Sequence, residues 1–274
     1  MIEACFFDLD KTVIDEQGRL YDGLESPLDL SRRRFAMTIL TARGGPRFRE
    51  AVRENPALTV TPGMPVALEN GARIVDDTAS RNLAYQPLSY DERAAVLDYI
   101  VSQPPLRYVA FHPRDPQAKT VLWSPDPAQA AGLHAAYSHN ADVFTSELSG
   151  LFRAIARHDP CMITCRTNGE PPADLPQDVQ WYTSGSTVNF IPAEVTKGTA
   201  ALTIADTAGL QLDTILAAGN DANDLPVLQL PGLACPVAVG LQLADMRGQL
   251  PPHTVYLPQP VQLGNFVMGK VVQS

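Results

Sequence analysis

Residues 4–12 read ACFFDLDKT, an apolar run that ends directly in two acidic residues separated by one leucine. The run is typical of a buried strand, in which successive side chains point to opposite faces. We therefore expect Asp8 and Asp10 to face the same region at the end of this strand, while Leu9 points back toward the core. Two like charges held that close need a cation or a shared proton. A strand that simply ends in solvated acids is the alternative that these residues leave open.

The composition is that of an ordinary globular chain of 274 residues, 45% hydrophobic and 19% charged. This length allows one large domain or two modest ones. The formal net charge of −9 argues against a nucleic-acid partner, because phosphate backbones are bound through clustered lysine and arginine. A small phosphorylated metabolite is not excluded, since a local group of cations can hold one phosphate inside an acidic protein.

The sequence gives no sign of a membrane or secretory protein. No stretch reaches the roughly 18 apolar residues of a membrane span, and the first residues lack the basic start of a signal peptide. We therefore expect a cytoplasmic protein without a membrane partner. The cysteines at positions 5, 161, 165 and 235 lie mostly in strand-like runs, which favours buried free thiols over disulfides or a zinc site. Both a monomer and a homodimer remain possible.

Strand-like and helix-like segments alternate over residues 1–77 and 189–274. This alternation predicts an α/β core with a parallel sheet covered by helices on both faces. Residues 78–188 contain many prolines and no glycine-rich strand-to-helix turns, so they are expected to form an inserted, smaller α+β domain. Asn70-Gly71 lies between two short apolar runs and predicts a hairpin. Ligands of parallel sheets gather at the carboxyl ends of the strands, which directs attention to the polar residues there.

Asp8, at the end of the first predicted strand, is a candidate carboxylate nucleophile toward phosphorus. Asp10 can serve as the acid/base that protonates a leaving oxygen and then deprotonates water. Lys197 stands where a predicted helix begins, and together with Mg²⁺ it can offset the negative charge of a phosphoryl group. Taken alone, the segment around Lys197 is more simply explained as a solvated lysine at a helix start.

Two further segments carry suitable groups at predicted strand ends. Thr41 ends an apolar run before Ala42 and Arg43, so its hydroxyl and the next backbone amides can cradle phosphate oxygens. A threonine that caps a helix is the ordinary alternative. Residues 219–224 read GNDAND, an oxygen-rich composition that suits a hard cation. An Asn/Asp-rich turn with a helix cap is the alternative there.

Taken in chain order, residues 8–12, 41–43, 197–198 and 219–224 resemble the four motifs of haloacid dehalogenase-like phosphatases. The segments ENGA at 69–72 and FIPAEVTKG at 190–198 further resemble the Cof-type branch, subfamily IIB, whose cap domain is inserted between the second and third motifs. The resemblance implies a Rossmann-like core, a mobile α/β cap and Mg²⁺ dependence. It also implies hydrolysis of phosphate monoesters, often sugar phosphates, through an aspartyl-phosphate.

By position, the resemblance implies that Asp8 is the nucleophile and a metal ligand, and that Asp10 is the acid/base whose backbone carbonyl also touches the metal. Asp224 would order the metal shell, and Asn223 would support the phosphate or Lys197. The phosphate-binding residues would be Thr41, Ala42, Arg43, Asn223 and Lys197.

Asn220 departs from the family pattern, which usually has aspartate directly after the glycine of the fourth motif as a metal ligand. An amide oxygen still binds Mg²⁺ but brings no charge. We therefore expect weaker metal affinity, or preference for another divalent ion, unless Asp221 or Asp224 compensates. Two other hypotheses stay open: a phosphosugar mutase that uses the same intermediate, and a non-catalytic ligand-binding protein that keeps the fold.

Overall fold

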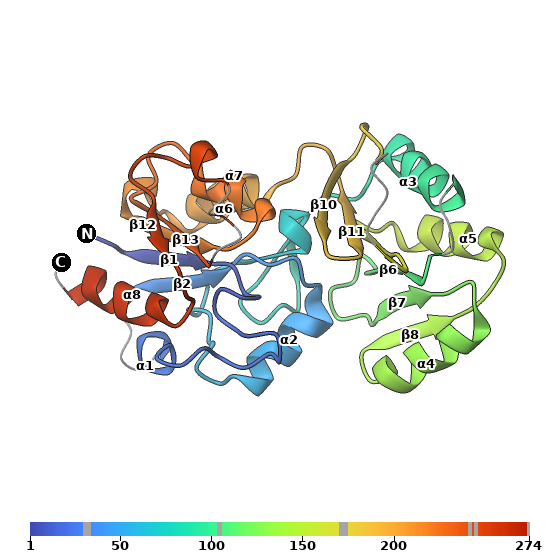
Figure 1. Cartoon of the computed structure of the whole chain (residues 1–274), viewed down its shortest axis with the longest axis horizontal. Helices are drawn as coiled ribbons and strands as arrows, with labels where there is room; N and C mark the ends of the chain where they lie inside the picture. Colours follow the sequence, from blue (N-terminus) through green and yellow to red (C-terminus); the bar gives the residue numbers. More distant parts are fainter. Residues whose placement is uncertain (30–33, 103–105, 170–174, 241–242, 244–245, 273–274) are drawn as a thin grey trace. The chain divides into compact units, whose positions relative to one another are not determined.

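The structure is a computed structural model that describes residues 1–29, 34–102, 106–169, 175–240, 243 and 246–272. The chain forms two compact units (Figure 1). Residues 1–43, 48–83 and 196–274 make up the first, called here the core unit, and residues 44–47 and 84–195 make up the second, the inserted unit.

The core unit is built on a five-stranded sheet in the order β14-β13-β12-β1-β2. Its strands are β1 (Ala4–Phe7), β2 (Ala36–Ile39), β12 (Ile215–Gly219), β13 (Cys235–Val239) and β14 (Val255–Leu257). Every pairing in it is parallel, and Phe7 at the end of β1 lies opposite both Ile39 and Ala218. The carboxyl ends of these strands therefore meet at one edge of the sheet.

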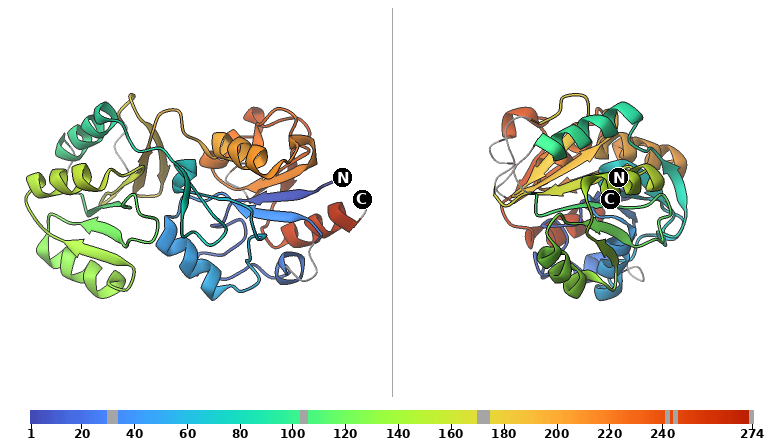
Figure 2. Two further views of the ribbon diagram at one scale, coloured as in Figure 1. Left: turned by 180° about the vertical axis from the view of Figure 1, so that it is seen from behind. Right: turned by 90° about the vertical axis from the view of Figure 1, so that its right-hand side faces the viewer.

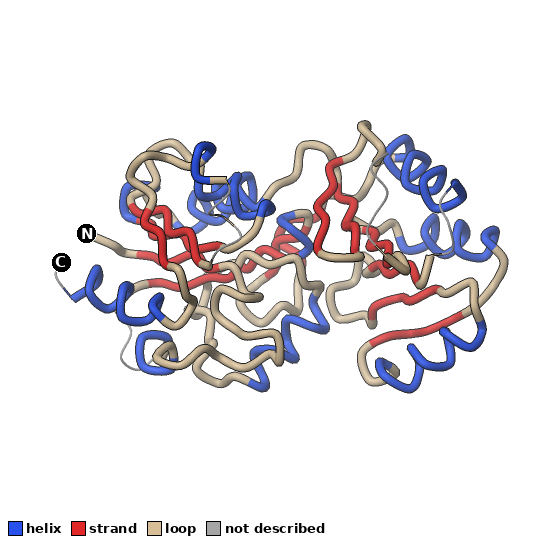
Figure 3. Tube along the Cα trace, in the orientation of Figure 1, coloured by secondary structure: helices blue, strands red, loops and turns tan. Residues whose placement is uncertain are grey.

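Burial explains why these short segments form strands. Every residue of β1, β12 and β13 is buried, as expected of a parallel sheet covered on both faces. The helices and 3-10 turns around the sheet are α1 (Glu25–Leu28), α2 (Gly45–Glu54), α6 (Lys197–Ala208), α7 (Leu225–Leu228), α8 (Gln262–Val272), η1 (Glu69–Gly71), η2 (Leu212–Thr214), η3 (Ala222–Asp224) and η4 (Arg247–Gln249). Figure 3 shows α6 and α7 on one side of the sheet and α1 and α8 on the other. The predicted α/β class is confirmed.

A small sheet in the order β3-β4-β5, in which β3 and β4 are antiparallel, lies beside this core. Its strands are β3 (Val66–Leu68), β4 (Arg73–Val75) and β5 (Asn82–Tyr85). Val66 pairs with Val75 and η1 joins the two strands, so the hairpin predicted at Asn70-Gly71 is present. A bridge between Leu40 and Ala67 attaches β3 to the end of β2.

Among its described residues, the inserted unit holds a six-stranded sheet in the order β10-β11-β9-β6-β7-β8, together with the helices α3, α4 and α5 (Figure 2). Its elements are α3 (Tyr90–Ser102), β6 (Tyr108–Phe111), β7 (Thr120–Trp123), α4 (Pro127–Tyr137), β8 (Ala141–Phe144), α5 (Leu148–His158), β9 (Ile163–Arg166), β10 (Gln180–Ser184) and β11 (Thr187–Ile191). Buried and half-buried residues alternate along β6 and β9, and the buried ones pack with apolar residues of α3 and α5. The domain edge expected at 188/189 falls inside β11, whose pairing with β9 and β10 keeps the whole strand in this sheet.

All four cysteines are buried and none is in a disulfide, as the sequence favoured. Within the described ranges, no helix has both the length and the apolar character needed to cross a membrane.

Candidate active site

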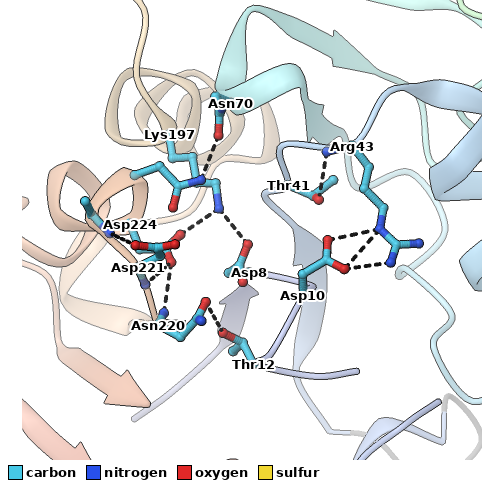
Figure 4. Close-up of polar contacts among 12 residues, drawn as sticks. Asp8, Asp10, Thr12, Thr41, Arg43, Asn70, Lys197, Asn220, Asp221 and Asp224 are labelled. Atoms are coloured by element: carbon cyan, nitrogen blue, oxygen red, sulfur yellow. Dashed lines mark hydrogen bonds and ion pairs between the residues drawn. The ribbon is translucent and has the colours of Figure 1, made fainter. Parts of the chain in front are cut away.

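Residues from both ends of the chain meet at the carboxyl edge of the core sheet (Figure 4). Asp8 directly follows β1, Thr41 lies just beyond β2, and Asn220 directly follows β12. Lys197 is the first residue of α6, which Thr196 caps by accepting a hydrogen bond from the backbone N–H of Thr199 at 3.0 Å. The site residues predicted from the sequence therefore lie together at this edge of the sheet.

The centre of the site is a buried ion triad of Asp8, Lys197 and Asp224. The Nζ atom of Lys197 lies 2.6 Å from Oδ1 of Asp8 and 2.7 Å from Oδ1 of Asp224. Lys197 and Asp224 are 0% exposed, and Asp8 is 6% exposed. A buried charge is tolerated only when it is paired and hydrogen-bonded, so the two carboxylates are what allow an ammonium here. Lys197 is therefore not a solvated residue at a helix start.

The triad changes the proton affinity of its members. Burial raises the pKa of the Asp8 carboxyl to about 7, with the charge of Asp224 adding to the rise and Lys197 opposing it. Burial by itself would lower the pKa of the Lys197 ammonium, but the carboxylates of Asp224 and Asp8 outweigh it and raise that pKa above its ordinary value. Lys197 thus stays charged, and one ammonium faces two carboxylates. An additional cation beside Asp8 would favour its ionised form.

Asp224 also organises the loop that follows β12. Its Oδ2 atom accepts hydrogen bonds from the backbone N–H groups of Asn220 at 2.8 Å and Asp221 at 3.0 Å. Gly219 makes this possible, because a Cβ atom there would lie 2.4 Å from the Asp224 carboxyl carbon. Both oxygens of Asp224 therefore accept hydrogen bonds from the protein, which makes the residue a support for Lys197 and for the loop.

Asp10 contacts a different cation from Asp8. Nη2 of Arg43 lies 2.6 Å from Oδ1 of Asp10, and Nε lies 3.0 Å from Oδ2. This forked contact is the strong geometry for an arginine and a carboxylate. The Asp10 side chain is 46% exposed, so the two aspartates of the opening motif differ sharply in their surroundings. Figure 4 shows them side by side, with Asp8 turned toward Lys197 and Asp10 toward Arg43.

The loop after β2 presents a hydroxyl group beside these carboxylates. Thr41 is fully buried, and its Oγ1 accepts a hydrogen bond from the backbone N–H of Arg43 at 3.1 Å. Because a hydroxyl also donates one hydrogen, Thr41 can still donate to a phosphate oxygen. Ala42, half-buried between the two, has only its backbone to offer a ligand.

Asn220 lies buried near the end of β1. Its Oδ1 accepts a hydrogen bond of 3.2 Å from the hydroxyl of Thr12, a buried residue that the sequence did not single out as functional. The sequence feature that could have identified Thr12 as a site residue is its position two residues after Asp10 in the opening motif.

The family resemblance places the Asp8 carboxylate, the Asp10 backbone carbonyl, the Asn220 side chain and Asp224 around a cation, although both Asp224 oxygens already accept hydrogen bonds from Lys197 and the loop. All are oxygen donors, the type that Mg²⁺ takes. In the part of the chain that the structure describes, no group of three or more histidine, cysteine and acidic side chains is arranged to hold a metal ion. The oxygen donors therefore fit a hard cation, but few of them carry a charge. The second carboxylate of the buried ion triad adds negative charge that would attract such a cation.

Asn223 completes the site from the loop after β12. Its Nδ2 donates to Oδ1 of Asn70 at 2.8 Å, across 153 positions of sequence. Asn70 is 0% exposed and lies in the turn η1. Sequence analysis identified Asn70 as a turn residue and as part of the ENGA segment at 69–72, but it did not identify Asn223 as its partner, because no local pattern reveals a contact so distant in sequence.

These features define an α/β protein with a parallel sheet, an inserted α+β unit, and a carboxylate–lysine cluster at the strand ends. The chain belongs to the haloacid dehalogenase-like hydrolases, whose sequence profile matches residues 5–241. A comparison with curated proteins gives no match.

Solved structures of low sequence identity share the fold. The phosphatase BT1666 from Bacteroides thetaiotaomicron is 15% identical with a TM-score of 0.70, over 100% of this chain and 94% of that one. A structure described as the HAD subclass IIB sugar phosphatase BT4131 is 14% identical with a TM-score of 0.70, over 99% and 98%. SMU.1108c from Streptococcus mutans UA159 is 14% identical with a TM-score of 0.73, over 99% and 100%. The core and the inserted unit thus both have counterparts in this fold.

Proposed function

We propose that this protein is a Mg²⁺-dependent phosphatase that hydrolyses a small phosphorylated metabolite through an aspartyl-phosphate on Asp8. The observation that carries the proposal is the buried ion triad, in which Lys197 lies 2.6 Å from the Asp8 carboxylate at the strand ends. The narrower proposal is a sugar phosphate or a related phosphomonoester. It is supported by the likeness of the fold to a sugar phosphatase.

In the first step an Oδ atom of Asp8 attacks the phosphorus atom, and the bond from phosphorus to the leaving oxygen breaks. Asp10 donates a proton to that oxygen, so the product leaves as an alcohol. Lys197 and the Thr41 hydroxyl bind phosphoryl oxygens and offset their charge. In the structure both oxygens of Asp10 accept hydrogen bonds from Arg43, with Nη2 at 2.6 Å from Oδ1, so Asp10 has to turn away from Arg43 with a proton to reach the leaving oxygen.

In the second step water attacks the phosphorus atom of the aspartyl-phosphate while Asp10, now a carboxylate, accepts a proton from it. The acyl-phosphate bond breaks, which releases inorganic phosphate and regenerates the Asp8 carboxylate. The raised pKa of Asp8 calls for a neighbouring positive charge if this carboxylate is to be ionised at neutral pH.

Asp8, the Asp10 backbone carbonyl and Asn220 would hold the Mg²⁺ ion. When bound, it supplies positive charge that eases the approach of an anionic phosphoryl group to a carboxylate. Because Asn220 replaces a charged ligand, the proposal includes weak Mg²⁺ affinity or a preference for Mn²⁺ or Co²⁺, which bind more tightly to a given ligand set.

The proposal is tested by measuring phosphate release from a panel of sugar phosphates, phosphorylated sugar acids and nucleotides, with Mg²⁺, Mn²⁺ or Co²⁺. Asp8→Asn is run in parallel, with Asp213→Asn, an exposed carboxylate of η2, as the matched control. We expect turnover in the wild type and the control but none in Asp8→Asn. Isomerised sugar phosphate without phosphate release would indicate a mutase instead. Ligand binding without any turnover would indicate a non-catalytic protein.

A further inference from the structure

The turn η1 holds an unusual backbone conformation beside the active site. Glu69, Asn70 and Gly71 all have positive φ, at 54°, 57° and 101°. Residues with a side chain rarely adopt this left-handed region, and asparagine tolerates it better than glutamate does. Such a conformation persists only where the surrounding structure fixes it, and it often marks a functional constraint.

One side of the turn is attached to the loop that carries Thr41. The backbone N–H of Asn70 donates to the Thr41 carbonyl at 3.0 Å, and that of Glu69 donates to the Arg43 carbonyl at 3.1 Å. The carboxylate of Glu69 accepts a hydrogen bond from Nε of Arg73 at 3.1 Å, and both of these side chains are buried. The turn is therefore anchored by buried interactions and is hydrogen-bonded directly to the Thr41 loop.

The other side of the turn contacts the segments that carry Lys197 and Asn223. A Cβ atom on Gly71 would lie 2.5 Å from the carbonyl oxygen of Thr196, the residue that caps α6 just before Lys197. The Asn70 side chain accepts the hydrogen bond from Asn223 at 2.8 Å. One turn thus contacts all three phosphate-side segments of the site.

We propose that Asn70 is a positioning residue that sets the orientation of the Asn223 amide and holds this amide in place relative to Thr41 and Lys197. In this arrangement Asn223, Thr41 and Lys197 can bind the same phosphate group. This inference rests on the proposed phosphatase function. In the proposed reaction Asn70 touches no reacting atom and acts through Asn223. Loss of the acceptor at Asn70 frees the half-buried Asn223 side chain, which must then be ordered again each time a phosphate binds.

The test uses Asn70→Gly, which keeps a backbone that accepts positive φ and removes the side chain together with its acceptor oxygen. Affinity for orthovanadate is measured by calorimetry in the presence of Mg²⁺, with kcat, KM and the melting temperature recorded beside it. We expect vanadate binding and kcat to fall about five- to tenfold, the size of one lost hydrogen bond, with a smaller change in KM. Asn223→Ala should cause a similar loss, and the double variant should be no worse than either single variant.

Asn55→Ala is the matched structural control. Asn55 is a buried asparagine whose side chain bonds to the backbone of Leu20, Gly18 and Ala51, none of which belongs to the site. This variant should lower the melting temperature and leave vanadate affinity unchanged. A merely structural role for Asn70 would give the same pattern as Asn55.

Wild-type vanadate affinity in folded Asn70→Gly, or additive losses in the double variant, would overturn the inference. If Asn70→Gly does not fold, Asn70→Asp keeps an acceptor oxygen in a residue type that tolerates positive φ. In the Asn70→Asp background, Asn223→Ala must still lower vanadate affinity. If Asn223→Ala has no effect on vanadate affinity there, the inference is equally overturned. A wild type that neither binds vanadate nor releases phosphate would instead reject the proposed function.

Discussion

Replacement of Lys197 by methionine tests the energetics of the buried ion triad. Methionine fills nearly the same space but removes an ammonium that lies 2.6 Å from Asp8 and 2.7 Å from Asp224. Removal of one partner from a buried ion pair typically costs about 3–5 kcal/mol, because the remaining charge is left without compensation. Since two carboxylates lose the same partner, we expect the free energy of unfolding at pH 8 to fall by an amount at the upper end of that range.

The loss should depend on pH in a definite direction. Burial and Asp224 already raise the pKa of Asp8 to about 7 in the folded wild type, and Lys197 is the group that opposes this rise. In Lys197→Met the folded-state pKa of Asp8 is therefore higher still, while in the unfolded chain it returns to its ordinary value near 4. Between these values the folded state binds more protons than the unfolded state, so stability falls as pH rises. The wild type shares this dependence up to about pH 7, so the destabilisation relative to the wild type should increase mainly above pH 7 and be larger at pH 8 than at pH 5.

The assay is urea unfolding of wild type and Lys197→Met at pH 5 and pH 8, without added metal. Lys119→Met is the matched control, because Lys119 is 46% exposed and its carboxylate partner Asp142 lies at 3.9 Å. Exposed pairs of this kind contribute about 0–1 kcal/mol. A Lys197→Met protein as stable as the control at pH 8, or one whose loss grows toward pH 5, would refute the reasoning.

Three further predictions follow from the same geometry. Asp10→Asn should lower kcat by about 10²- to 10⁴-fold while vanadate affinity stays within a few-fold of wild type in calorimetry; unchanged kcat would contradict the acid/base role. Asn220→Asp should tighten Mg²⁺ binding in a titration without substrate, because it adds a charged ligand beside Asp8, whereas equal dissociation constants would count against a metal contact at this position. Gly219→Ala should lower the melting temperature and vanadate affinity together, since its Cβ would lie 2.4 Å from the Asp224 carboxyl carbon; a shift in the melting temperature alone would show that Asp224 does not support Lys197.

Much of the fold could be predicted because its signals are local. The apolar run before Asp8 becomes β1, the run that includes residues 36–39 becomes β2, and Asn70-Gly71 becomes the turn of a hairpin. Elements in which polar and apolar residues are mixed were harder to predict from the sequence. β8 reads ADVF and has only one fully buried residue, Ala141, and no element was predicted there. Its pairing with β7 gives it strand structure that its own sequence does not specify.

The sequence by itself determined which chemical groups stand at strand ends and helix starts, because strands and helices are predicted from the pattern of apolar and polar residues along a short stretch of chain. It placed Asp8, Asp10, Thr41 and Lys197 in the right kinds of position. Only the tertiary structure decided which groups touch. Lys197 reaches Asp8 across 189 positions, and the structure assigns both oxygens of Asp224 to Lys197 and the loop. Contacts of this kind depend on how parallel strands align their ends, which no short stretch of sequence encodes.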